Sequence, residues 1–128
     1  MSKVTWSQIG ANENAVLSPA FVHNDVVYTA GCLGDKSGEF SKDIEVQTEL
    51  AIKNLEKVLA ASNSSLDNCL RVTVFIAKGK HVAKVNEVYK KYFKTKPARA
   101  CVVVGFPNKK VLVEIEAVAY TKTVKAKL

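Results

Sequence analysis

The stretch that decides the fold is KPARACVVVGFPNKKVLVEIEAVAY, residues 96–120. Two β-rich apolar runs, at about 100–105 and 111–121, flank a turn, which predicts two strands joined as a hairpin. In the second run one face would carry Val111, Val113, Ile115, Ala117 and Ala119, and the other Leu112, Glu114, Glu116 and Val118. Arg99 stands at the start of the first run. Burying a charge is costly, so the Arg99 charge and the Glu114 carboxylate in such apolar strands indicate either an ion pair or a functional site.

Arg99 and Arg71 are the only arginines among 19 basic residues. A guanidinium is a planar fork that stays charged and grips a carboxylate through two hydrogen bonds, so Arg99 is a candidate for binding a substrate carboxylate. The alternative is an ion pair across the hairpin with Glu114 or Glu116. If Glu114 lies in a cleft, desolvation would raise its pKa and let it exchange a proton with water near neutrality. Glu116 is the more ordinary solvated or lysine-paired carboxylate.

Cys101 follows Arg99 by two residues and therefore shares its strand face. A nucleophilic thiol is one interpretation, but no histidine is close in sequence and no helix N-terminus would lower its pKa. Its backbone carbonyl is the more economical contribution to a site. Asn86, in the middle of a predicted helix, is either a solvent-facing or a partly buried amide.

Two amphipathic helices are predicted upstream, over 44–61 and 81–93. Asp43 is the expected N-cap of the first helix, with Ser41 as the alternative. The inward stripes comprise Ala51, Ile52, Leu55, Val58 and Leu59 in the first helix, and Val82, Val85, Tyr89 and Tyr92 or Phe93 in the second.

The remaining segments complete an α+β pattern. Residues 20–33 predict a hairpin, 70–77 a buried strand, 4–9 a short strand, and 34–43 a loop. The resulting order, β-ββ-α-β-α-ββ, fits a single domain over residues 1–128. Two helices cannot cover both faces of such a sheet. We therefore expect a homo-oligomer in which sheets meet and cover Val102, Val104, Val113 and Ile115.

The net charge of +7 comes mostly from lysines near the second helix, the Lys109-Lys110 turn and the C-terminal segment. A basic surface attracts phosphates, but the chain lacks the interleaved arginines and aromatic residues that stack bases. A solvated lysine face is the preferred interpretation, with nucleic-acid binding as the weaker one.

Three cysteines at long spacings indicate reduced thiols in a reducing compartment. With only two histidines, no zinc-ligand spacing exists, so no metal is expected. No apolar run approaches the roughly 20 residues of a membrane span. The first residues resemble neither a signal nor a transit peptide, and a cytoplasmic location is expected.

Four segments carry a resemblance to a known family: PARACVVVGFPNKKVLVEIEAVAY (97–120), SSLDNCLRVTVFIA (64–77), VNEVYKKYF (85–93) and AVLSPAFVHNDVVYTAGCLG (15–34). They are similar to the YjgF/RidA family, whose C-terminal signature reads P-A-R-S-x-V…P…V-E-I-E-A-I-A. The resemblance implies a chorismate-mutase-like α+β fold, with a mixed β-sheet and two helices packed on one face. It also implies a homotrimer with a central β-barrel and ligand clefts between subunits.

The activity that the resemblance implies is hydrolysis of reactive 2-imino acids or enamines to 2-keto acids and ammonia, without a cofactor. Arg99 would hold the substrate carboxylate and Glu114 would activate water. The backbone around Cys101 and Gly31 would hydrogen-bond the substrate, and Asn86 falls where the family carries an asparagine near the cleft. Orientation and electrostatics would supply most of the rate.

The chain departs from the family pattern on the other side of the cleft. It reads Ser18-Pro19-Ala20 where deaminating members read G-P-Y, leaving Phe21 next door without a hydroxyl, and Ala30-Gly31-Cys32 where they read S-G-Q. Cys32 and Cys101 are then expected near one cleft as a redox-sensitive pair. Two alternatives to catalysis follow: a carboxylate-binding or chaperone-like trimer, and an RNA-directed activity.

Overall fold

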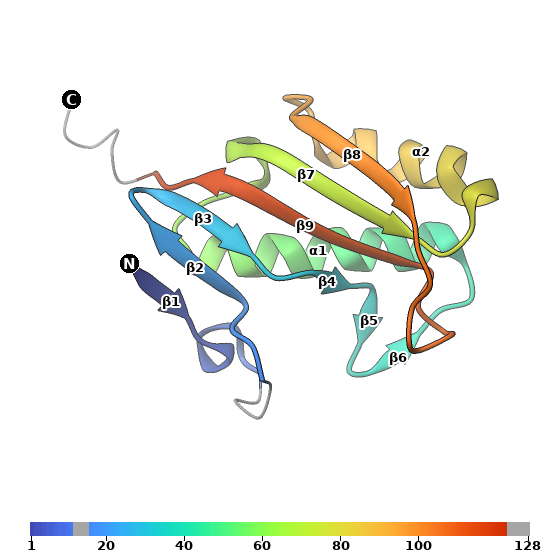
Figure 1. Ribbon diagram of the computed structural model, residues 1–128, viewed down its shortest axis with the longest axis horizontal. Coiled ribbons are helices and arrows are strands. Elements are labelled where there is room, and N and C mark those ends of the chain that lie inside the picture. Colours follow the sequence, from blue (N-terminus) through green and yellow to red (C-terminus); the bar gives the residue numbers. More distant parts are fainter. Residues whose placement is uncertain (12–15, 123–128) are drawn as a thin grey trace.

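The computed structural model describes residues 1–11 and 16–122 of the chain. Seven strands form one mixed sheet (Figure 1). Its order is β1 (Ser2–Val4), β2 (Ala20–His23), β3 (Val26–Thr29), β9 (Val113–Tyr120), β7 (Cys69–Ile76) and β8 (Ala98–Val103), with β4 (Cys32–Leu33) also paired to β9. Neighbouring strands are antiparallel except β7 and β8, which are parallel.

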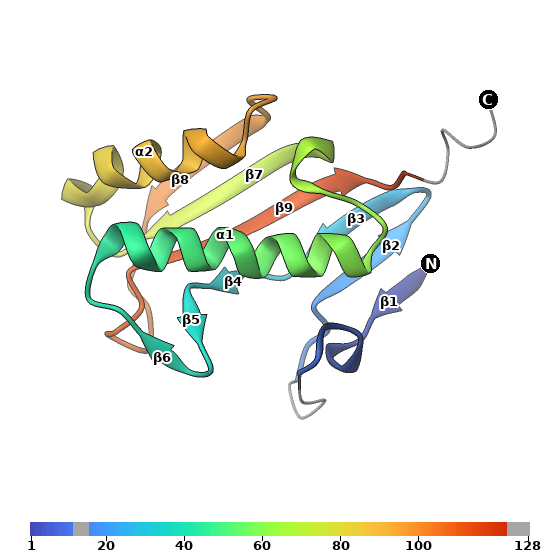
Figure 2. The same cartoon turned by 180° about the vertical axis from the view of Figure 1, so that it is seen from behind.

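Both long helices, α1 (Ile44–Ala61) and α2 (Val82–Tyr92), cover the same face of the sheet (Figure 2). We call this the helix face, and the opposite one, which carries no helix in the described residues, the open face. The predicted α+β architecture, a mixed sheet with two helices on one side, is confirmed. Among the described residues no helix is both long and apolar enough to cross a membrane.

The α1 helix begins and packs as its sequence predicts. Asp43 is the N-cap, and its Oδ1 accepts hydrogen bonds from the backbone N–H groups of Glu45 at 2.8 Å and Val46 at 3.4 Å. The whole predicted apolar stripe of α1 is buried. In α2 the prediction of Val82 was wrong, because this first-turn residue is 37% exposed and Val88 lies in the core instead.

The predicted C-terminal hairpin is wrong, because β7 lies between β8 and β9. The chain leaves β7, passes through α2 and returns as β8 parallel to β7, as a strand–helix–strand crossover does. β9 then pairs antiparallel with the other side of β7. Two backbone hydrogen bonds at the end of β7 hold the segments next to β8 and β9. Val104 N donates to Ile76 O, and Ala77 N donates to Leu112 O, each at 2.9 Å.

The alternation predicted for β9 is confirmed, but the helices alone bury its apolar side. Val113 and Ile115 are 1% and 2% exposed within one chain, so the expectation that they need cover from another copy was wrong. Val102 does remain 42% exposed, and by register it lies on the open face next to Phe75. Phe21 and Tyr28 are exposed on the same face.

Two shorter predictions also need correction, and one is confirmed. The strand expected over 4–9 ends at Val4, and Trp6–Ile9 form a 3-10 helix. The loop expected over 34–43 contains a ribbon, β5 (Asp35–Lys36) and β6 (Glu39–Phe40), whose turn residues Ser37 and Gly38 have positive φ. The β2–β3 hairpin is present, with Asn24 and Asp25 also at positive φ.

Candidate active site

Arg99 lies on the helix face at the start of β8. It is in register with Val72 of β7, which is fully buried under the helices. The Arg99 guanidinium carbon lies 4.7 Å from the centre of the Tyr89 ring in α2, and this ring stacks on Phe93 at 4.3 Å. Such a contact attracts the cation to the ring face and fixes the plane of the guanidinium. Its N–H edges remain available to a planar anion.

The Tyr89 ring is a neutral platform for this cation. Burial raises the pKa of its phenol to about 12; the Arg99 charge acts in the opposite direction and Cys69 adds a smaller upward effect. The hydroxyl oxygen is buried and has no hydrogen-bond partner among the described residues. Sequence reasoning placed Tyr89 only on the inner face of its helix. The strand–helix–strand crossover brings α2 beside β8 and so places Tyr89 against Arg99.

The alternative assignment of Arg99 to an ion pair across the sheet is wrong. In the described residues no carboxylate lies within ion-pair distance of it, and the one such pair found there joins Lys90 to Glu87. Glu114 is in register with Phe75, and Glu116 with Thr73, so both carboxylates lie on the open face. β7 and the sheet itself separate them from the Arg99 guanidinium.

Glu114 packs against the backbone of Gly31. A β-carbon added at Gly31 would overlap the Glu114 carboxylate and lie 2.7 Å from its Cδ, so only glycine permits this approach. Partial burial raises the pKa of Glu114 above its ordinary value, and the nearby Glu116 raises it further. The carboxylate is therefore better suited to accept and return a proton than an ordinary surface glutamate.

Cys101 shares the helix face with Arg99, as predicted, and packs at the edge of the core. Cys32 is buried in β4, where burial, helped by Glu114, raises the pKa of its thiol to about 12. Its Sγ donates to Ala30 O at 3.8 Å. Both features describe an unreactive thiol.

The expected proximity of Cys32 and Cys101 does not hold within one chain. The register runs from Cys32 to Ile115, Val74 and Cys101 across four strands. Three strand spacings of about 4.8 Å separate the two cysteines, roughly 14 Å. A disulfide requires Cα atoms within about 7 Å.

Asn86 is exposed on α2, three residues before Tyr89 and so on a neighbouring part of the helix surface. Its amide is therefore on the same side of the molecule as Arg99. Phe21 lies instead on the open face, in register with Lys3 and Tyr28. In the described residues no group of three histidine, cysteine, aspartate or glutamate side chains could hold a metal ion.

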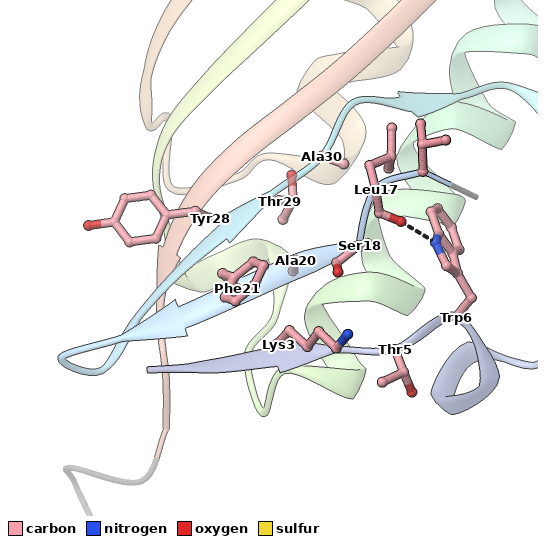
Figure 3. Close-up of a pocket in the computed structure, with 11 residues that line it drawn as sticks. Lys3, Thr5, Trp6, Leu17, Ser18, Ala20, Phe21, Tyr28, Thr29 and Ala30 are labelled. Carbon is pink, nitrogen blue, oxygen red and sulfur yellow. Dashed lines mark hydrogen bonds between the residues drawn. The ribbon is translucent and has the colours of Figure 1, made fainter. Parts of the chain in front are cut away.

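A cavity of about 560 Å³ opens beside Phe21, between the N-terminal segment and the β2–β3 hairpin (Figure 3). Its lining comprises Lys3, Thr5, Trp6, Val16, Leu17, Ser18, Ala20, Phe21, Tyr28, Thr29 and Ala30. Trp6 and Leu17 stand at one end, where the Trp6 Nε1–H donates to Leu17 O at 2.6 Å. Sequence reasoning placed Phe21, Ala20 and Ala30 at a cleft but missed Lys3, Trp6 and Leu17, which only the folded chain brings there.

The predicted site residues thus form two groups. Arg99, Cys101 and Asn86 lie at the α2–β8 edge, whereas Gly31, Glu114 and Phe21 lie toward the other side of the sheet. One chain does not bring the two groups together. They can share a ligand only where a second copy presents one group to the other.

The chain is similar to known proteins over almost its whole length. The family model described as Endoribonuclease L-PSP matches residues 11–121. A RutC family protein of Pyrococcus horikoshii is 36% identical over 124 residues, which cover 94% of this chain and 98% of that protein. TdcF of Escherichia coli, named "Putative reactive intermediate deaminase", is 35% identical over 100 residues, or 73% of this chain and 78% of TdcF.

Solved structures give the same result. The crystal structure of yeast Mmf1 matches with a TM-score of 0.83 at 35% identity, covering 95% of this chain and 98% of that one. The structure of Escherichia coli TdcF with bound serine matches with a TM-score of 0.84 at 28% identity, covering 94% of this chain and all of TdcF (100%).

Proposed function

Because the chain belongs to the YjgF/RidA family, whose model is described as Endoribonuclease L-PSP, we propose that it hydrolyses reactive 2-imino acids and enamines. The products are 2-keto acids and ammonia. The observation that carries the proposal is the Arg99 guanidinium, which is fixed on the Tyr89 ring and has no carboxylate partner in the described residues. TdcF with its bound serine supports a small ligand that bears a carboxylate.

Arg99 would bind the substrate carboxylate through two parallel hydrogen bonds, with the exposed Asn86 amide near the same edge. This grip fixes the imine carbon relative to the sheet and lowers the entropic cost of the reaction. The backbone groups of Cys101 and Gly31 would orient the carboxylate and the imine nitrogen. Neither cysteine forms a covalent intermediate in this scheme.

Glu114 would act as the base. Its carboxylate takes a proton from water as the water oxygen attacks the imine carbon, and passes this proton to the imine nitrogen. The tetrahedral carbinolamine then collapses: Glu114 takes the proton of the hydroxyl, which becomes the keto group, and gives it to the amine nitrogen as the carbon–nitrogen bond breaks and ammonia leaves. The raised pKa of Glu114 suits both transfers.

This mechanism requires two copies of the chain, because Arg99 and Glu114 lie on opposite faces of one sheet. We propose the homotrimer with a central barrel that the family resemblance implies. Phe21, Tyr28 and Val102 support it, since these apolar residues are 41%, 50% and 42% exposed on the open face.

A second candidate is a trimer that binds small carboxylates without turnover. Ala20 and Ala30 favour it, because neither supplies a hydroxyl to the cavity beside Glu114. An RNA-directed activity has weaker support. The charge of +7 permits RNA binding. A histidine pair suited to RNA hydrolysis is not evident, because the chain's two histidines lie on different elements, His23 at the end of β2 and His81 before α2.

The test is keto-acid formation from imines generated in situ by an amino-acid oxidase. The protein should accelerate hydrolysis over the uncatalysed rate, and Arg99→Ala should abolish the acceleration. Arg71→Ala, which removes the chain's other arginine, is the matched control and should retain it. No acceleration, combined with calorimetric binding of 2-ketobutyrate, would favour the binding protein. RNA binding that persists at physiological salt would favour the third activity.

A further inference from the structure

The cavity between the N-terminal segment and the β2–β3 hairpin takes no part in holding the carboxylate or activating water. Its volume of about 560 Å³ lies within the usual range for small-molecule sites. We propose that it binds the side chain of the substrate, and that the preferred substrates are 2-imino acids with large apolar side chains, branched or aromatic. This inference rests on the proposed imine hydrolysis and specifies its substrate class.

The position of the cavity next to Glu114 is the first argument. Ala30 lines the cavity, and its chain neighbour Gly31 lies against the Glu114 carboxylate. Neighbouring Cα atoms are about 3.8 Å apart, so the cavity begins within one residue of the base. The side chain of an imino acid is bonded directly to the carbon that water attacks. It therefore leaves the reacting centre close to the mouth of this cavity.

The chemistry of the walls is the second argument. Leu17 and Phe21 offer hydrocarbon side chains to the cavity, whereas the adjoining Ala20 belongs to the buried core. The Trp6 Nε1–H is already bonded to Leu17 O, which leaves its indole ring as an apolar wall. Methyl and ethyl side chains would leave most of this space to water. An isobutyl or benzyl group would fill more of the space and replace that water.

Lys3 is the one charged group among the lining residues. Its side chain is exposed, and Figure 3 shows it extending along the side of the cavity toward Thr5. An acidic substrate side chain would have to pair with it. Thr5, Ser18 and Thr29 add hydroxyls to the lining, beside the apolar side chains of Trp6, Leu17 and Phe21. Lys3 at the rim can also lie over an aromatic ring.

The first test compares imines made in situ from alanine, leucine and phenylalanine. The leucine and phenylalanine imines should have a kcat/KM at least about tenfold higher than the alanine imine. Leu17→Ala should reduce this preference about threefold or more. Leu70→Ala is the matched control, because Leu17 and Leu70 are 52% and 50% exposed and Leu70 does not line the cavity.

Two results would overturn the assignment. One is a preference for the alanine imine that Leu17→Ala leaves unchanged. The other is a preference for the glutamate imine that Lys3→Ala abolishes, because this would make the cavity a site for acidic side chains.

A binding measurement separates failure of this inference from failure of the proposed hydrolysis. Trp6 is the only tryptophan of the chain, so its fluorescence reports on the cavity directly. Titration with 4-methyl-2-oxopentanoate should change Trp6 emission saturably, and pyruvate should change it much less. Such a change without turnover of any imine would refute the hydrolysis and retain the cavity as an apolar side-chain site. Turnover without any Trp6 response would refute the cavity assignment alone.

Discussion

Arg99 owes its orientation to Tyr89, and this contact can be tested separately from the charge. Tyr89→Leu removes the ring under the guanidinium, which lies 4.7 Å from its centre. We expect KM to rise about 3- to 30-fold with little change in kcat, from the magnitude of cation–π contacts. Tyr89→Phe keeps the ring and should keep KM. Steady-state kinetics with the best imine substrate measures both.

The control lies one turn along the same helix. Tyr92 carries Lys53, not Arg99, over its ring, with the Lys53 Nζ 5.9 Å from the ring centre. Tyr92→Leu should lower stability without raising KM. Equal KM changes in Tyr89→Leu and Tyr92→Leu would mean that the ring only holds α2 in place. Tyr89→Phe should not lower the melting temperature, since the buried hydroxyl has no partner in the described residues.

The Glu114 carboxylate predicts a specific pH dependence. Its pKa is raised first by partial burial and second by Glu116. As the base, Glu114 must be ionised, so kcat/KM should rise with pH through a pKa above that of an ordinary glutamate. Glu116→Gln removes the second cause and should shift this acid limb to lower pH. Glu39→Gln, on the exposed β5–β6 ribbon, should leave the profile unchanged. An unshifted limb in Glu116→Gln would remove Glu114 as the titrating base.

The same shift has a consequence for stability, with a definite sign. The folded pKa of Glu114 lies above its unfolded value, so the group stabilises the fold most below the unfolded pKa. That contribution is lost as the pH rises through the folded pKa. Glu114→Gln should therefore make the free energy of unfolding less dependent on pH over this window. The effect is small, because solvent screens a carboxylate that is only partly buried.

Helix α1 is tied to the chain entering β9 by one buried side chain, Gln47. Its Oε1 accepts from Leu112 N at 2.6 Å and Val113 N at 3.3 Å. Its Nε2 donates to Ser41 O at 2.8 Å and Lys110 O at 3.1 Å. Gln47→Leu leaves these buried groups unpaired and should cost about 3 kcal/mol of unfolding free energy in urea titrations. Lys57→Leu, on the exposed side of α1, should stay within about 0.5 kcal/mol. A matching loss in both variants would contradict the bridging role of Gln47.

Local structure could be predicted from the sequence wherever neighbouring residues decide it. The Asp43 cap and the buried stripe of α1 follow from contacts within a few residues, and both are present. The alternation along β9 follows from strand geometry alone. The β2–β3 turn at Asn24 and Asp25 is another local decision. For the same reason Arg99 and Cys101 could be assigned to one face of their strand.

Strand pairing and the cavity could not be predicted in this way, because distant segments decide them. In sequence alone, the apolar runs around Arg99 and Glu114 fit a direct hairpin as well as they fit the observed pairing of both strands with β7. The α2 crossover makes β8 parallel to β7 and leaves β9 only the other edge of β7. In the cavity, one side-chain hydrogen bond joins Trp6 to the backbone of Leu17, 11 residues along the chain. No local pattern encodes that contact.

In the molecule as a whole, the sheet separates the two halves of the proposed site. Arg99 points to the helices and Glu114 to the open face, and β7 lies between their strands. A ligand that touches both side chains must therefore lie between copies of the chain. In a ring of identical subunits each cleft would take Arg99 from one copy and Glu114 from its neighbour. No single chain would then supply both Arg99 and Glu114 to the same cleft.

This geometry predicts complementation between two inactive variants. Arg99→Ala and Glu114→Gln should each be inactive alone. When they are co-expressed in equal amounts, an intact cleft needs Arg99 from a Glu114→Gln chain and Glu114 from an Arg99→Ala chain. Each choice has a probability of one half, so about a quarter of the wild-type imine hydrolysis should return. Mixing the separately purified variants without subunit exchange should restore nothing and is the control. Absence of recovery in co-expressed, co-purified oligomers would show that the two side chains do not act in one cleft between subunits.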